Sequence, residues 1–297
     1  MDDLNINWFP GHMTKALRMM RANLKLVDVV IELLDARIPY SSANPVINEL
    51  LEGKPRIVAL NKADLADPEW TDKWIKHFRT QGLQVVALDA MTGTGTKALV
   101  GQVEKLGSAK AGKLVAKGVN ARAVRAMILG IPNVGKSSLI NNLKGVHVAN
   151  TADKPGVTRG KQWIKISRNL ELLDTPGVLW PKFEDPEVGF RLAITGAIKE
   201  DVYDIEKVVV RMLTLLGEQY SQRLIERYNL TAPLPEDANE LLDLIGKRRG
   251  CLRSGGVIDY EKTRRLILKE FRDTKLGNFT LDRPGEKTRA EEDNSEK

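Results

Sequence analysis

Short apolar runs that end in polar residues alternate with amphipathic stretches up to Gly177. The runs predict buried strands at residues 29–35, 56–60, 84–88, 123–129, 163–166 and 170–173. The stretches between them predict helices at residues 44–51, 70–81, 96–106 and from 137 onward. This alternation is typical of an α/β domain with a mostly parallel sheet and flanking helices.

After Gly177 the pattern becomes helical, with glycine breaks between the helices. Helices are expected at residues 206–216, 219–228, 239–249 and 260–274. We therefore expect an α/β domain at residues 1–185 and a small all-helical domain at residues 186–283. Residues 284–297 carry almost no apolar side chains and predict a disordered tail.

Composition narrows the class of protein. The chain has 297 residues, enough for two domains. Its one cysteine, Cys251, excludes an internal disulfide, and polar residues near the N-terminus argue against a signal peptide. No uncharged apolar run approaches the roughly 20 residues that span a bilayer. We expect a cytoplasmic protein that is not embedded in a membrane.

The formal net charge of +7 is unevenly distributed. Residues 200–243 carry 10 acidic and 4 basic side chains, a net charge of −6. Residues 247–283 carry 11 basic and 5 acidic side chains, a net charge of +6. The second predicted domain is therefore acidic at its beginning and basic at its end.

Residues 130–137 (GIPNVGKS) fit the phosphate-binding loop pattern and lie between a predicted strand and a predicted helix. Backbone N–H groups of such a loop surround phosphates, Lys136 reaches the terminal oxygens, and the Ser137 hydroxyl binds Mg²⁺. The residues expected to bind the nucleotide here are Asn133, Val134, Gly135, Lys136, Ser137 and Ser138.

Residues 61–64 (NKAD) follow another apolar strand. Alone they could form a polar turn, but beside a phosphate loop they indicate a guanine site. The Asp64 carboxylate can accept from the ring N–H and the amine of guanine, and it would repel the acceptor edge of adenine. We expect Asn61, Lys62, Ala63 and Asp64 to bind GTP rather than ATP. One strand later, Asp89 and Ala90 predict a second base loop, with the Ala90 N–H facing the guanine oxygen.

Residues 174–177 (DTPG) predict the remaining part of the site, with Asp174 near Mg²⁺ and the Gly177 N–H near the terminal phosphate. Thr158 is the favoured switch threonine that closes on Mg²⁺, and Thr151 is the alternative. Val178 stands where many GTPases have a glutamine that orients the attacking water. His12 is a candidate for that task, although a lone histidine in such a place is more often a solvated or packed residue.

The order of these motifs departs from that of the usual GTPase. The base-reading residues 61–64 precede the phosphate loop, and residues 174–177 follow it. The ring of elements is cut between the last of these segments and the base reader, so the chain is a circularly permuted GTPase.

The chain resembles the YlqF/RbgA family of bacterial circularly permuted GTPases, which act as ribosome biogenesis GTPase A. The segments that carry the resemblance are residues 8–13 (WFPGHM), 35–37 (DAR), 61–64, 130–137, 155–158 (PGVT) and 174–177. The resemblance implies a late step in assembly of the large ribosomal subunit, with GTP hydrolysis stimulated by the particle. It also implies that His12 replaces the missing glutamine, with Lys136 and Thr158 as the other catalytic residues.

The resemblance also suggests ligands and partners. Ser137, Thr158 and Asp174 would hold Mg²⁺, and Asn133 lies where potassium-dependent GTPases use an asparagine, which suggests a K⁺ ion. The helical domain would bind ribosomal RNA of the subunit precursor, and the protein would be a monomer off the ribosome. The residues expected to bind RNA are Lys247, Arg248, Arg249, Arg253, Arg264 and Arg265.

Other interpretations remain open. The basic residues could form a solvated helix face. A GTP-gated binding module could act on non-ribosomal RNA, with incidental hydrolysis. A metabolic ATPase would conflict with the guanine-reading residues 61–64.

Overall fold

The computed structural model describes residues 11–51, 53–115, 122–145, 163–173, 177, 179 and 185–285, with backbone alone at residues 11–16, 48–49 and 109–115. These residues form two compact units. The sheet unit contains the described residues up to Asp185 together with residues 280–285, and the helical unit is Pro186–Phe279. Residues 280–283, which the sequence analysis placed in the second domain, thus pack within the sheet unit.

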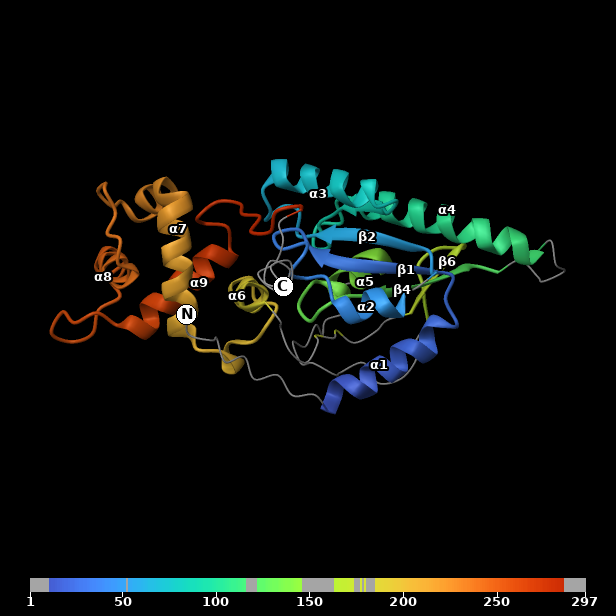
Figure 1. The fold of residues 1–297 in the computed structure, drawn as a ribbon, viewed down its shortest axis with the longest axis horizontal. Helices are drawn as coiled ribbons and strands as arrows, with labels where there is room; N and C mark the ends of the chain where they lie inside the picture. Colours follow the sequence, from blue (N-terminus) through green and yellow to red (C-terminus); the bar gives the residue numbers. More distant parts are fainter. Residues whose placement is uncertain are drawn as a thin grey trace, which may run out of the picture. The chain divides into compact units, whose positions relative to one another are not determined.

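The sheet unit is built on six strands among the described residues, in the spatial order β3-β2-β1-β4-β6-β5 (Figure 1). The strands are β1 (Val29–Asp35), β2 (Arg56–Asn61), β3 (Gln84–Ala87), β4 (Val124–Leu129), β5 (Trp163–Lys165) and β6 (Leu170–Leu173). Neighbouring strands are parallel except for the antiparallel pair β5 and β6. Every residue of β1 is buried, as expected for a central strand of a parallel sheet.

Helices cover both faces of this sheet. They are α1 (Gly11–Leu24), α2 (Pro45–Leu50), α3 (Pro68–Thr80), α4 (Thr96–Val115) and α5 (Lys136–Lys144). Met20 and Leu24 of α1 pack with Met127 and Leu129 of β4 on one face. On the opposite face, Gly107 of α4 lies so close to β4 that a Cβ there would be 2.2 Å from Val124 Cγ1. Because side chains alternate along β4, α1 and α4 lie on opposite faces.

The helical unit contains α6 (Pro186–Ile194), a 3₁₀ turn (Glu200–Val202), α7 (Ile205–Tyr228), α8 (Ala238–Arg248) and α9 (Tyr260–Arg272). Aspartates 204, 237 and 259 begin α7, α8 and α9 by accepting backbone N–H groups, as N-caps do. The helix α7 spans two helices expected from the sequence and contains a non-helical residue, Tyr220, near the expected break.

The expected fold class is confirmed: a permuted α/β unit with a mostly parallel sheet precedes a helical region. The structure adds α6, which the sequence analysis did not predict, and extends α4 to Val115. Six of the nine residues of α6 are buried, so it lacks the polar face that makes a helix recognisable in a sequence. Most of the predicted tail, residues 286–297, lies outside the described residues.

The two glycines of α4 offer a test of this packing. A Cβ at Gly101 would meet nothing within 4 Å, whereas at Gly107 it would clash with Val124. We expect Gly101→Ala to raise the free energy of unfolding by about 0.5–1 kcal/mol because alanine favours the helix. Gly107→Ala should lower it by about 1–3 kcal/mol because α4 must move away from the sheet. Urea denaturation of the two variants compares these values, and equal effects would contradict the α4–β4 contact.

Candidate nucleotide-binding site

The phosphate loop joins β4 to α5, where the expected strand-to-helix context is found. Asn133 has a φ of 55° and Gly135 a φ of 104°, so the loop turns back on itself before α5 begins. The Nζ atom of Lys136 donates to the carbonyl oxygens of Gly130, at 3.1 Å, and Ile131, at 2.6 Å. The loop therefore places a lysine ammonium and the positive end of α5 together, an arrangement that suits phosphate oxygens.

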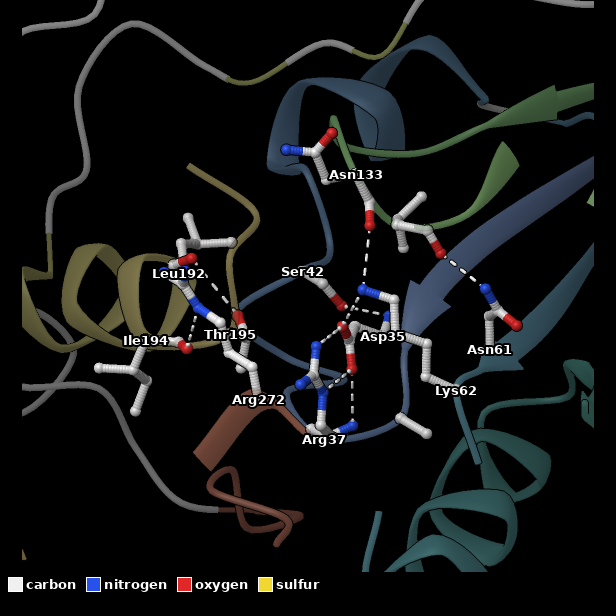
Figure 2. A network of polar contacts seen from close by, with 12 residues as sticks. Asp35, Arg37, Ser42, Asn61, Lys62, Asn133, Leu192, Ile194, Thr195 and Arg272 are labelled. Carbon is white, nitrogen blue, oxygen red and sulfur yellow. Dashed lines mark hydrogen bonds and ion pairs between the residues drawn. The ribbon is translucent and has the colours of Figure 1, made fainter. Parts of the chain in front are cut away.

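Asn61 connects the base-reading segment to this loop. Its Nδ2 atom donates to the Val134 carbonyl oxygen at 2.7 Å (Figure 2). Its Oδ1 atom accepts from the Ala90 N–H at 2.9 Å. A Cβ at Gly135 would lie 2.2 Å from Asn61 Nδ2, so only glycine leaves room for the amide. One buried side chain thus holds the phosphate loop and the second base loop together.

Lys62 makes the second connection. Its Nζ atom donates to the Asn133 carbonyl oxygen at 2.9 Å and lies 3.0 Å from Asp35 Oδ2. Arg37 grips the same carboxylate with Nε and Nη2, at 3.0 and 2.8 Å, as Figure 2 shows. The sequence analysis quoted residues 35–37 only as part of a resemblance and assigned them no task. Asp35 orients Lys62 through a contact between residues 27 positions apart, which no local sequence pattern predicts.

Asp35 stays ionised in this buried setting. Burial alone raises the pKa of its carboxyl group, but the charges of Arg37 and Lys62 and their hydrogen bonds outweigh burial and hold the pKa well below its usual range. Burial lowers the pKa of the Lys62 ammonium, and the neighbouring Asp35 carboxylate opposes that shift. The carboxylate therefore fixes two cations, one of which contacts the phosphate loop.

The remaining residues expected to read the base include Asp64, Asp89 and Ala90, and each has different surroundings. Asp64 is exposed. The pKa of its carboxyl group is nevertheless raised, first by the partial loss of solvent around the carboxyl group and then by the nearby Asp89 charge. The Asp89 carboxylate, which was expected to contact the nucleotide, accepts from the Met91 N–H at 2.8 Å and from Thr92 Oγ1 at 2.5 Å. Asp89 thus shapes the loop that carries Ala90. The Ala90 N–H, which was assigned to the guanine oxygen, donates to Asn61.

The third motif reaches the phosphate loop at Gly177. A Cβ at this position would lie 2.7 Å from Lys136 Nζ and 2.8 Å from the Pro132 nitrogen. The Gly177 backbone therefore lies against the phosphate loop. Ser137 is exposed and Ser138 half-buried in the first turn of α5.

Several expected residues cannot be placed. Thr151, Thr158, Asp174 and Val178 lie outside the described residues. His12 belongs to the first turn of α1, where only the backbone is described.

The described residues are compatible with Mg²⁺. No group of three or more His, Cys, Asp or Glu side chains that could hold a metal ion occurs among them. A nucleotide-bound Mg²⁺ needs few protein ligands because phosphates and waters supply the others. The exposed Ser137, the residue directly after Lys136, suits such an ion, and GTPases in general use Mg²⁺.

The basic residues of the helical unit divide into two groups. Four of the six expected RNA-binding residues form ion pairs within the unit. These pairs are Arg249 with Glu270 (2.7 Å), Arg253 with Asp259 (3.2 Å), Arg264 with Glu206 (2.8 Å) and Arg265 with Glu200 (3.2 Å). Lys247 and Arg248 are exposed at the end of α8 and form no ion pair with another described residue. These two side chains are therefore the more available for a polyanion.

Across the residues that the structure describes, none of the helices combines the length and the apolar character needed to cross a membrane.

Comparisons with known proteins agree with this geometry. Residues 125–232 match the family described as 50S ribosome-binding GTPase. The chain is 53% identical to the ribosome biogenesis GTPase A of Priestia megaterium, over 95% of this chain and 98% of the relative.

Two solved structures of YlqF also match. A GNP-bound structure of YlqF from T. maritima covers 92% of this chain and 100% of its own at 26% identity, with a TM-score of 0.61. A GDP-bound structure of TM YlqF covers 91% of this chain and 100% of its own at 26% identity, with a TM-score of 0.62. The expected GTP hydrolase is thereby confirmed, and the chain belongs to the ribosome biogenesis GTPase A family.

Proposed function

We propose that this GTPase is an assembly factor for late maturation of the large ribosomal subunit and that the ribosomal particle stimulates its hydrolysis of GTP. The observation that carries nucleotide binding is the pair of contacts from Asn61 and Lys62 to carbonyl groups of the phosphate loop. The ribosomal role is supported by the relatives, whose names refer to ribosome biogenesis, and by the match to a 50S ribosome-binding family.

Each part of the nucleotide has a proposed set of partners. The exposed Asp64 carboxylate accepts from the ring N–H and the amine of guanine, and the Lys62 stem covers a face of the base. Backbone N–H groups from Asn133 to Ser138 surround the phosphates, and the Lys136 ammonium neutralises their charge. GTP and GDP are the ligands of this site.

The metal sites follow from the same loop. Ser137, Thr158 and Asp174 hold Mg²⁺, which neutralises charge on the phosphate oxygens. Asn133, whose side chain is exposed, holds K⁺ against the phosphates. Support for K⁺ comes only from the position of this asparagine in the loop.

His12 takes the place of the glutamine that orients water in many GTPases, because the residue after Gly177 is Val178. An imidazole can orient water or accept its proton near neutral pH. The Gly177 N–H and Thr158 close on the terminal phosphate. In this scheme His12, Lys136 and Thr158 are the catalytic residues.

The first test is GTP turnover in potassium buffer with and without purified large ribosomal subunits. We expect the subunits to accelerate turnover on the order of tenfold or more, because an external particle completes the site. Small subunits serve as the control particle, Lys136→Ala as the inactive enzyme, and sodium buffer as the test of K⁺. No acceleration with GDP binding intact would favour the alternative, a GTP-gated switch that acts on non-ribosomal RNA.

A second test removes the imidazole. His12→Ala should slow subunit-stimulated turnover on the order of a hundredfold while GDP affinity stays unchanged, because the water loses its orienting group. His77→Ala, in α3, is the matched control and should keep full activity. Unchanged turnover in His12→Ala would exclude the catalytic role.

A third test separates RNA contact from structure within the basic cluster. Lys247→Ala and Arg248→Ala should each weaken binding to ribosomal RNA and reduce the slope of log affinity against log salt by about 1, with stability unchanged. Arg249→Ala should instead lower the free energy of unfolding by about 1 kcal/mol, because buried Glu270 loses one of its two arginine partners. Filter binding and urea denaturation measure the two effects, and equal affinities for all variants would refute RNA contact at this end of α8.

A further inference from the structure

After the helical unit ends at Phe279, the chain returns to the sheet unit at residues 280–283, which we call the C-terminal clasp. The Leu281 N–H donates to the Arg37 carbonyl oxygen at 2.7 Å. The Asp282 carboxylate accepts from the Ser41 N–H at 2.7 Å and from Ser41 Oγ at 2.8 Å. The clasp therefore holds the loop that follows β1.

The clasp also holds the beginning of α3, which follows the base-reading segment. The Asp67 N–H donates to Thr280 Oγ1 at 3.1 Å, and Trp74 Nε1 donates to the Asp282 carbonyl oxygen at 3.2 Å. Thr280 and Asp282 are each only 1% exposed. Their polar groups are thus buried and paired, and removing one leaves its partner unsatisfied.

Consecutive contacts lead from the clasp to the phosphate loop. Asp282 binds Ser41, and the next residue, Ser42, accepts the Asp35 N–H at 3.0 Å. Asp35 in turn pairs with Lys62 at 3.0 Å, and Lys62 donates to the phosphate loop. Each of these contacts is 3.0 Å or shorter, and Asp282, Ser41, Ser42 and Asp35 are buried. We therefore expect a shift of the clasp to displace Lys62.

A shorter route reaches Asn61. The Ala36 N–H donates to the Asn61 carbonyl oxygen at 2.8 Å, and the Ala36 carbonyl oxygen accepts from Thr280 Oγ1 at 3.5 Å. Asp35 and Asn61 are paired in register at the ends of β1 and β2. The clasp thus braces both strands at the point where the guanine-reading residues leave the sheet.

We propose that Thr280 and Asp282 are positioning residues of the guanine-base site, so that an intact clasp slows the release of GDP and sharpens the choice of guanine over other bases. The inference rests on the proposed nucleotide site and requires no ribosome. The clasp follows the helical unit directly in the chain. A movement of the C-terminal end of the helical unit would therefore shift the clasp and, through it, the base-reading residues.

The test uses the full-length protein and the fluorescent analogue N-methylanthraniloyl-GDP. Asp282→Ala should release this analogue about five- to thirtyfold faster than the wild type, the effect expected from losing one buried hydrogen-bonded pair. It should also lose part of its preference for GDP over IDP, which lacks the amine that Asp64 recognises. A loss of folded protein alone would lower the affinity for both nucleotides equally and leave the ratio unchanged.

Two further variants make the result decisive. Asp273→Ala removes an exposed aspartate at the end of α9 and should match the wild type. Thr280→Val removes one hydroxyl at constant shape and carries the same test if Asp282→Ala fails to fold. Unchanged release rates and unchanged GDP/IDP ratios in the folded variants would overturn the inference. A wild type that does not prefer GDP to IDP would instead refute the proposed guanine site.

Discussion

Two hydrogen bonds, one from the last residue of β2 and one from the residue after it, connect the base-reading segment to the phosphate loop. Asn61 and Lys62 belong to an early part of the chain, yet they bind the carbonyl oxygens of Val134 and Asn133. Without these bonds, the base and phosphate ends of a nucleotide would be held by independent loops. The parallel sheet brings the loops together because the carboxyl ends of β1, β2 and β4 meet at one edge. Cutting the chain elsewhere changes the order of the motifs but leaves this edge intact.

The buried carboxylate of Asp35 determines where Lys62 can lie. A lysine beside a phosphate loop would otherwise sample many rotamers, whereas here one oxygen of Asp35 and one loop carbonyl fix its ammonium. Arg37 neutralises the rest of the Asp35 charge with two hydrogen bonds. The site therefore uses an internal cation to orient a second cation, and the arrangement depends on exclusion of water from Asp35, which is 2% exposed.

Much of the sheet unit could be predicted from the sequence because its information is local. The strands and the three nucleotide motifs are short patterns, and the structure places Asn61, Lys62, Lys136 and Gly177 together. Asp89 was expected at the nucleotide, and the structure adds contacts within its own loop that the sequence pattern does not specify, because a carboxylate after a strand fits a loop-shaping residue as well as a ligand. The pairing of Ser41 with Asp282 spans 241 residues, and no periodicity marks it. The ion pairs of Arg249 and Arg264 were likewise invisible, since their acidic partners lie elsewhere in the helical unit.

Among the described residues, the clasp joins parts of the sheet unit that lie more than 200 residues apart in the sequence. Residues 280–283 leave the translating ribosome after the helical unit. The loop that contains Ser41, 241 residues before Asp282, therefore lacks its clasp partner until then. Domains generally fold as the chain emerges, and contacts of long sequence separation form late. If the clasp positions the guanine site as proposed, a nascent chain that stops short of residue 280 has the nucleotide motifs but lacks the contacts that hold the base-reading loops.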